Sequence, residues 1–180
     1  TLLASSAASD VYKRQLITLC AWITIPTVVP FTLQTFAIFL AVGILGGKPG
    51  SLSVLVYLLL GAVGLPVFSG FSGGIGRFAG VTGGYLIGFL LIPLVMWGAQ
   101  TLFGKGPVVF VLSAAVGLAV CYAFGTAWFV LMYAATSGPV GVVSALWSCV
   151  IPFLIPDALK LALALVLSRR LAPVMAKAAA

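Results

Sequence analysis

Apolar runs long enough to cross a lipid bilayer recur along most of this chain of 180 residues. A helix needs about 20 mainly apolar residues to cross the hydrocarbon core of a membrane. Stretches such as SVLVYLLLGAVGL lack the polar–apolar alternation of membrane β-strands. Because 63% of the residues are hydrophobic and 6% are charged, we expect an all-α, multi-pass membrane protein without a soluble domain.

The segment 1–15 is polar and rich in Ser and Ala, unlike the rest of the chain. Its string DVYKRQ resembles the translated end of a transposon used in sequencing libraries. The apolar residues from Leu16 to the break at Pro26 make only about 15 Å of helix, which is too short to cross a membrane. We therefore interpret 1–15 as a non-native segment that replaces the start of the first helix.

Prolines, glycines and charged residues divide the remaining chain into six apolar helices. The segment 139–154 is too short and too closely flanked by proline for an easy crossing, and we expect a hairpin-like or interfacial segment there. Residues 16–172 are thus predicted to form one six-helix membrane domain, with a cytoplasmic tail at 173–180. The expected helices cover residues 16–25, 32–46, 51–65, 84–103, 108–135 and 156–171.

Basic residues mark one side of these six crossings. The other side carries only Arg77. Since cytoplasmic loops are enriched in Lys and Arg, both termini are predicted to be cytoplasmic. The basic residues on the cytoplasmic side are Lys13, Arg14, Lys48, Lys105, Arg169, Arg170 and Lys177.

Composition argues against several kinds of chemistry. The chain has no histidine, its acids are Asp10 and Asp157, and Cys20, Cys121 and Cys149 form no C-x-x-C pair. A metal site or a catalytic carboxylate pair therefore lacks the necessary side chains, and we expect no enzyme activity, metal or cofactor. The net charge of +7 reflects scarce acids and basic loops, not nucleic-acid binding.

Asp157 and Lys160 lie one helical turn apart in the apolar run LIPDALKLAL, so they share a helix face. A charge within the membrane costs several kcal/mol. Mutual neutralisation, with Asp157 behind Pro156 in the first helical turn, explains the acid well. It explains Lys160 poorly, because the dipole at a helix N-terminus repels a cation. We therefore favour a ligand-binding role for both residues.

Other features leave two interpretations open. Gln34, after the turn PFTLQT, either bonds helix to helix or faces an outer cavity. Gly80, Gly84 and Gly88 recur at every fourth position, which is typical of close helix packing. The aromatic residues near the outer ends fit either an interfacial belt or the walls of a ligand site. They are Trp22, Phe31, Phe68, Phe71 and Tyr85.

Four motifs in order resemble the BioY family, the substrate-binding subunits of biotin transporters of the energy-coupling-factor (ECF) type. The resemblance covers residues 22–170, and the glycine-rich T-G-G-Y-L and P-D-x-x-K motifs together are specific. One departure is Val81, where the family has proline. The motifs are PFTLQT at 30–35, YLLLGAVGLPVF at 57–68, GGIGRFAGVTGGYLIG at 73–88 and PFLIPDALKLALA at 152–164.

The resemblance implies a six-helix fold that binds biotin from the outer face. It also implies a membrane scaffold subunit and two cytoplasmic ATPases as partners, although some members act without them. The matching site residues are Asp157 and Lys160 of D-x-x-K, Gln34 of P-x-T-x-Q, and Gly83, Gly84 and Tyr85 of the loop motif.

Biotin matches this set of residues chemically. Its ureido ring offers two N–H groups that Asp157 can accept and a carbonyl. Lys160 is suited to the carbonyl or to the valerate carboxylate, and Arg77 competes for the carboxylate. Phe31 and Trp22 are among the aromatic residues available for the apolar ring and chain.

Three alternatives remain at this stage. A related subunit for another vitamin would be distinguished by a ligand panel. A membrane-embedded enzyme needs a nucleophile, base or metal set that the composition does not offer. A structural membrane protein would tolerate joint replacement of Asp157 and Lys160 by apolar residues.

Overall fold

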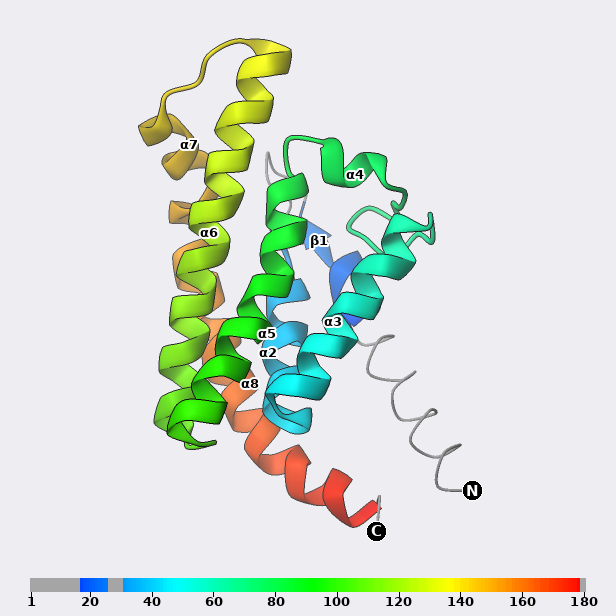
Figure 1. Cartoon of the computed structure of the whole chain (residues 1–180), viewed down its shortest axis with the longest axis vertical. Helices are drawn as coiled ribbons and strands as arrows, with labels where there is room; N and C mark the ends of the chain where they lie inside the picture. The colour runs from blue at the N-terminus through cyan, green and yellow to red at the C-terminus, as the bar shows by residue number, and fades with distance from the viewer. Residues whose placement is uncertain (1–16, 26–30, 179–180) are drawn as a thin grey trace.

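The computed structural model describes residues 17–25 and 31–178, and this part of the chain is almost entirely helical (Figure 1). Residues 17–22 are helical, and the strands β1 (Thr24–Ile25) and β2 (Phe31–Thr32) follow as a short antiparallel pair. The remaining helices are α2 (Gln34–Leu45), α3 (Gly47–Ala62), α4 (Gly76–Ala79), α5 (Gly83–Phe103), α6 (Pro107–Ser137), α7 (Val142–Cys149) and α8 (Ile151–Ala178).

The helices have the composition of a multi-pass membrane protein. Within the described residues, three segments are long and apolar enough to cross a bilayer: α5, α6, and the α7–α8 run Val142–Leu171. The helices α2 and α3 are apolar but shorter. The predicted polytopic helical fold is confirmed, with the small β1–β2 pair as an addition. The predicted boundary at residue 15 lies outside the described residues.

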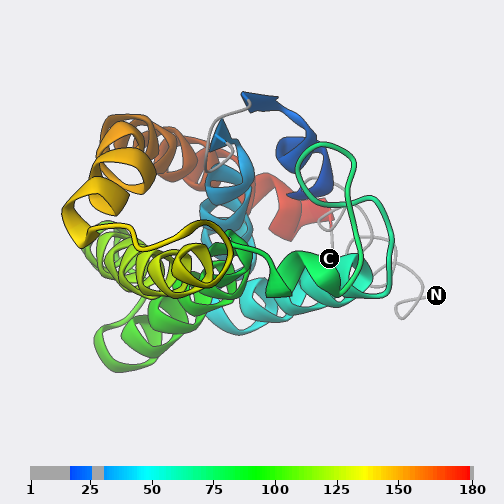
Figure 2. The same cartoon turned by 90° about the horizontal axis from the view of Figure 1, so that it is seen from above.

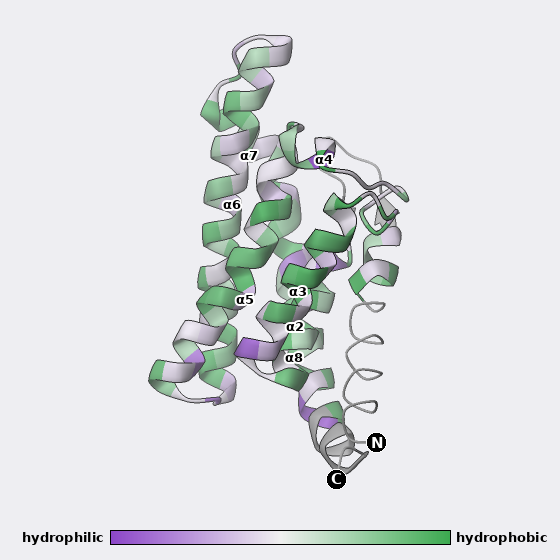
Figure 3. Cartoon of the chain, turned by 45° about the vertical axis from the view of Figure 1, so that its right-hand side comes forward, coloured by the Kyte–Doolittle hydropathy of each residue, from purple (hydrophilic) through white to green (hydrophobic). Residues whose placement is uncertain are grey.

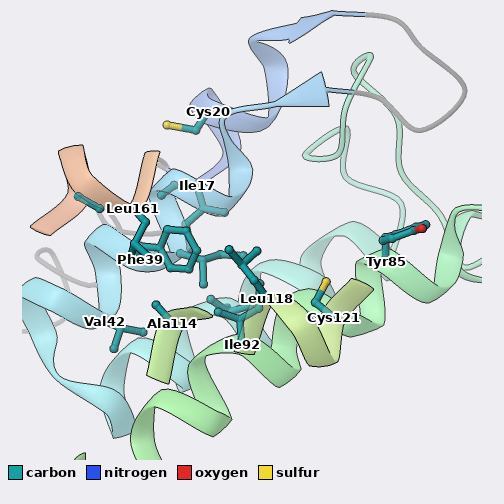
Figure 4. Close-up of a cluster of buried hydrophobic side chains, with 14 of the residues drawn as sticks. Ile17, Cys20, Phe39, Val42, Tyr85, Ile92, Ala114, Leu118, Cys121 and Leu161 are labelled. Atoms are coloured by element: carbon teal, nitrogen blue, oxygen red, sulfur yellow. The ribbon is translucent and has the colours of Figure 1, made fainter. Parts of the chain in front are cut away.

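Helix α2 lies in the middle of the bundle (Figure 2) and packs against α3, α5 and α8. Eight of its twelve residues are buried, including Ile38 and Phe39. Figure 4 shows Phe39 among buried side chains from neighbouring helices, such as Ile92 of α5 and Leu161 of α8. The polar residues that begin α2 are therefore enclosed by the other helices.

Small residues allow α5 and α6 to approach closely. A Cβ atom added at Gly88 would lie 2.7 Å from the sulfur of Cys121, and one at Gly117 would lie 3.1 Å from the Cα of Ile92. Glycine is needed at both places because no side chain fits between the backbones. The predicted packing role of Gly88 is confirmed, whereas Gly80 precedes α5.

Two predicted helix starts are wrong. Helix α3 begins at Gly47 instead of residue 51, because Pro49 is accommodated in its first turn. Helix α8 begins at Ile151 instead of Pro156. The first-turn proline of α8 is Pro152, and Asp157 lies about 9 Å along the helix. Asp157 therefore cannot act as a first-turn residue that stabilises the helix dipole.

The segment expected to be hairpin-like contains the helix α7, which packs against α6 and α8. Ala145 and Cys149 are its buried residues, whereas Val143 and Trp147 are exposed. The structure thus places α7 at the start of the continuous apolar run Val142–Leu171 instead of in a separate hairpin.

Hydrophilic positions lie toward both ends of the bundle, and a few more lie inside it, behind α3 (Figure 3). The α2–α3 turn, the α5–α6 turn and the last turns of α8 lie at one end, and α4 lies at the other (Figure 1). Lys48, Lys105, Arg169 and Arg170 therefore share one end, opposite Arg77 on α4. This distribution matches the one expected from six crossings.

Candidate functional site

A buried ion pair lies on α8. Lys160 Nζ is 2.8 Å from Asp157 Oδ1, and the two residues are 7% and 3% exposed. The i, i+3 spacing brings the groups together on one face, as predicted. Two charges removed from water in this way need further hydrogen bonds to compensate for their lost hydration.

Neighbouring elements supply those hydrogen bonds. Lys160 Nζ donates to the Thr32 carbonyl at 2.7 Å and to Thr35 Oγ1 at 3.2 Å. Thr35 Oγ1 donates to Asp157 Oδ1 at 2.9 Å, and the Tyr122 hydroxyl donates to Asp157 Oδ2. The pair thus joins β2, α2, α6 and α8 in one polar network.

This network forms the polar wall of a first pocket of about 410 Å³. The other side chains of the wall are aromatic or aliphatic or carry a thiol group. The lining residues are Thr32, Thr35, Tyr85, Phe89, Leu118, Cys121, Tyr122, Cys149, Phe153, Asp157 and Lys160.

A second pocket of about 470 Å³ adjoins the first, since Thr32, Tyr85 and Phe89 line both. Its wall is more polar and carries the cation Arg77. Its other lining residues are Gln34, Phe68, Ser69, Ser72, Thr82 and Leu86. The carboxylate of Asp157 thus belongs to the first pocket and the guanidinium of Arg77 to the second.

Gln34 belongs to a chain of hydrogen bonds at the edge of the second pocket. Its Nε2 donates to the Tyr57 hydroxyl at 2.6 Å, and that hydroxyl donates to the Val67 carbonyl at 2.9 Å. Its Oε1 accepts from Thr32 Oγ1 at 3.3 Å. Gln34 is 2% exposed, so both of the earlier interpretations hold: it bonds to a neighbouring helix and it lines a cavity.

Tyr85 stands between the two pockets. In Figure 4 it projects from α5 beyond Cys121 of α6, at the edge of the buried cluster. Its hydroxyl is hydrogen-bonded to Thr126 Oγ1 at 2.9 Å, and a Cβ atom at Gly125 would fall on its ring. Helix α6 therefore fixes the ring position from two sides.

Within the described part of the chain, the predicted site residues Gly83, Gly84 and Trp22 line neither pocket. Added Cβ atoms at Gly83 and Gly84 would fall on Phe78 and Trp128, so these glycines serve close packing. Trp22 donates from Nε1 to the Pro66 carbonyl at 2.9 Å, and its ring centroid lies 4.7 Å from that of Phe71. The side chain of Phe31 lies outside the described part of the chain.

Several pocket residues were not predicted from the sequence. Tyr122 and Thr35 bond directly to Asp157, and Cys121 and Cys149 line the first pocket. A tyrosine within the apolar run of α6 was the available signal for Tyr122. Thr35 stands next to Gln34 in the motif PFTLQT but was not singled out.

The site can bind polar groups, but it lacks the groups for metal chemistry. Among the described residues, no cluster of three His, Cys, Asp or Glu side chains could hold a metal ion. The fold and site therefore define a multi-pass membrane protein with a pocket between its helices that carries a buried ion pair. Comparison with known proteins gives the family: the BioY family model matches residues 10–177, and the chain belongs to that family.

Two relatives cover most of this chain. The probable biotin transporter BioY of Pyrococcus horikoshii is 43% identical over 143 residues, or 79% of this chain and 80% of that protein. The biotin transporter BioY of Thermotoga maritima is 41% identical over 157 residues, or 87% of this chain and 89% of that protein.

A solved structure has the same fold. It is the crystal structure of the S component for biotin from an ECF-type ABC transporter, with a TM-score of 0.81 and 26% sequence identity. The match covers 93% of this chain and 90% of the solved one. The polytopic helical fold expected from the family resemblance is therefore supported over nearly the whole chain.

Proposed function

We propose that this chain is the biotin-binding specificity subunit of a membrane vitamin transporter, and that biotin is its cargo, not a cofactor. The observation that carries the proposal is the pair of adjoining pockets, of which one is lined by Asp157 and the other by Arg77. Biotin is elongated and has a hydrogen-bonding ureido ring at one end and a carboxylate at the other. Membership of the BioY family supports the same cargo.

The ureido ring occupies the first pocket in this proposal. Asp157 accepts one of its N–H groups in a charge-assisted hydrogen bond. Phe89, Leu118 and Phe153 surround the apolar part of the bicyclic ring. Tyr85 lies where the ring meets the alkyl chain, because it lines both pockets.

The carboxylate extends into the second pocket toward Arg77. The hydrogen bonds of Lys160 support this orientation of biotin. All three ammonium protons of Lys160 already have acceptors, in Thr32, Thr35 and Asp157, so Lys160 is not the partner of the carboxylate. Arg77 has the planar guanidinium that best matches a carboxylate. Ser69 and Ser72 supply additional hydroxyl groups in the same pocket.

Transport requires other subunits in this proposal. The chain binds biotin from the outer face, and a membrane scaffold subunit with two cytoplasmic ATPases supplies the energy. The match to an S component of an ECF-type ABC transporter supports this assembly. The chain itself catalyses no reaction, and its sequence has no phosphate-binding G-x-x-x-x-G-K-[S/T] motif.

The test is calorimetric titration of the purified protein with biotin and with biotinamide, which lacks the carboxylate charge. The variant Arg77→Gln should bind biotin about ten- to a hundred-fold more weakly than the unaltered protein, because it lacks one charge-assisted hydrogen bond to the carboxylate. The same variant should bind biotinamide as the unaltered protein does. Lys105→Gln, at the opposite end of the bundle, is the matched control and should bind both ligands normally.

A panel of other water-soluble vitamins completes the experiment. Binding of another vitamin in preference to biotin would refute the assigned cargo. If Arg77→Gln lost affinity equally for biotin and for biotinamide, the assigned orientation would be refuted. The assignment of biotin as the cargo would still stand.

A further inference from the structure

We propose that the Tyr122 hydroxyl is the donor for the ligand's ureido carbonyl, and that it reaches this partner by releasing Asp157. This inference rests on the proposed function and names a residue that holds the same ligand. Its basis is the hydrogen-bond inventory around Asp157, in which every donor near the carboxylate already has an acceptor.

The proton of Tyr122 has a definite position in the structure. The carboxylate of Asp157 is paired with an ammonium group, so it is ionised and can only accept hydrogen bonds. A phenol has one proton, so Tyr122 donates it to Asp157 Oδ2. The Tyr122 hydroxyl thus occupies Asp157 Oδ2, the oxygen that an N–H group of the ligand needs as its acceptor.

The neighbouring donors cannot serve the ligand without breaking the network. Thr35 gives its proton to Asp157 Oδ1 and accepts from Lys160. Lys160 has acceptors for all three protons, and one of them is the main-chain carbonyl of Thr32. Removing Lys160 from that buried carbonyl would leave an unsatisfied acceptor, which is costly.

Tyr122 can change partners without this cost. On one edge of a cyclic urea, an N–H donor and a carbonyl acceptor lie side by side and point the same way. Asp157 Oδ2 and the Tyr122 hydroxyl are an acceptor and a donor within hydrogen-bonding distance of each other. When the ligand arrives, Asp157 accepts its N–H and Tyr122 donates to its carbonyl.

This exchange leaves each polar group satisfied in both states. In the structure, Tyr122 and Asp157 satisfy one another, and in the complex the urea edge satisfies both. The pocket therefore selects ligands that carry an H–N–C=O edge, as ureas and lactams do. A ligand with only a donor or only an acceptor on that edge leaves Tyr122 or Asp157 without a partner.

The test is infrared spectroscopy of bound biotin labelled with carbon-13 at the ureido carbonyl. The carbonyl band of the saturated complex should move to higher frequency in Tyr122→Phe, because the donor is absent. Biotin affinity should fall about tenfold. Tyr133→Phe, farther along α6, is the matched control and should leave band and affinity unchanged.

A second variant keeps the hydroxyl and so preserves the folded pocket. Tyr122→3-fluorotyrosine has a more acidic phenol and should shift the band to lower frequency. An unchanged band in this variant would overturn the inference, even if Tyr122→Phe cannot be saturated. A band shift in Lys160→Met with none in the Tyr122 variants would assign the carbonyl to Lys160 instead.

The outcomes separate the two proposals. If the unaltered protein does not bind biotin, the proposed function fails. If it binds biotin with a carbonyl band that is insensitive to both Tyr122 variants, only the role of Tyr122 fails.

Discussion

Lys160 Nζ lies 2.7 Å from the main-chain carbonyl oxygen of Thr32, although 128 residues separate them along the chain. The contact ties α8 to the short strand that leads into α2. Because the same ammonium also pairs with Asp157, Lys160 contributes to the stability of the fold and to the shape of the first pocket.

We expect Lys160→Met to lower the free energy of unfolding by about 3–5 kcal/mol. The substitution leaves Asp157 as a buried, unpaired carboxylate and removes the donor of the Thr32 carbonyl. Thermal unfolding of the detergent-purified protein without ligand measures the effect.

The double variant Asp157→Asn/Lys160→Met is the control for that experiment. It should recover most of the stability, because the unpaired charge is gone, but it should not recover biotin binding. A double variant with unimpaired biotin affinity would show that the pair is purely structural.

Tyr57→Phe should destabilise the protein by about 1–3 kcal/mol, because Gln34 Nε2 and the Val67 carbonyl lose their shared partner. The second pocket should also loosen, and biotin affinity should fall. Ser53→Ala on the same helix removes only a local bond to the Pro49 carbonyl. Chemical denaturation should therefore give a smaller change for that variant, and equal changes would contradict the role of Tyr57.

Gly125→Ala should displace the ring of Tyr85, because the added methyl group would fall on it. Overpacking of this kind costs about 1–3 kcal/mol, and a displaced Tyr85 alters both pockets. We expect reduced stability and weaker biotin binding, measured by thermal unfolding and calorimetry.

Gly98→Ala on α5 is the matched glycine control. Its added methyl group meets no atom within 4 Å, and Gly98 lies inside a helix. Replacing a helical glycine by alanine should stabilise the protein by about 0.5–1 kcal/mol, with biotin affinity unchanged. Equal effects at the two positions would contradict the close contact between Gly125 and Tyr85.

The orientation in the membrane can be tested with single cysteines in a version that lacks the three native cysteines. Gly76 and Gly106 both have open space around them and lie at opposite ends of the bundle. An impermeant thiol reagent applied to whole cells should label Gly76→Cys and spare Gly106→Cys, since the basic end is predicted to be cytoplasmic. The reverse labelling pattern would contradict that orientation.

The sequence by itself determined the class of protein, the order of the helices and the contact between Asp157 and Lys160. Long apolar runs, glycine and proline breaks and i, i+3 spacing are local properties, and local geometry translates them directly into structure. The family motifs depend on short stretches of residues in order, and for that reason they too could be recognised from the sequence.

The tertiary structure alone decided which residues complete the site. Thr35 and Tyr122 reach Asp157 from 122 and 35 residues away along the chain. In a membrane protein, the faces of a helix toward lipid and toward other helices are both apolar, so periodicity does not reveal the inward face of α6. The start of α8 was also ambiguous in the sequence, because Pro152 and Pro156 can each stand in a first helical turn, and the structure begins the helix before Pro152.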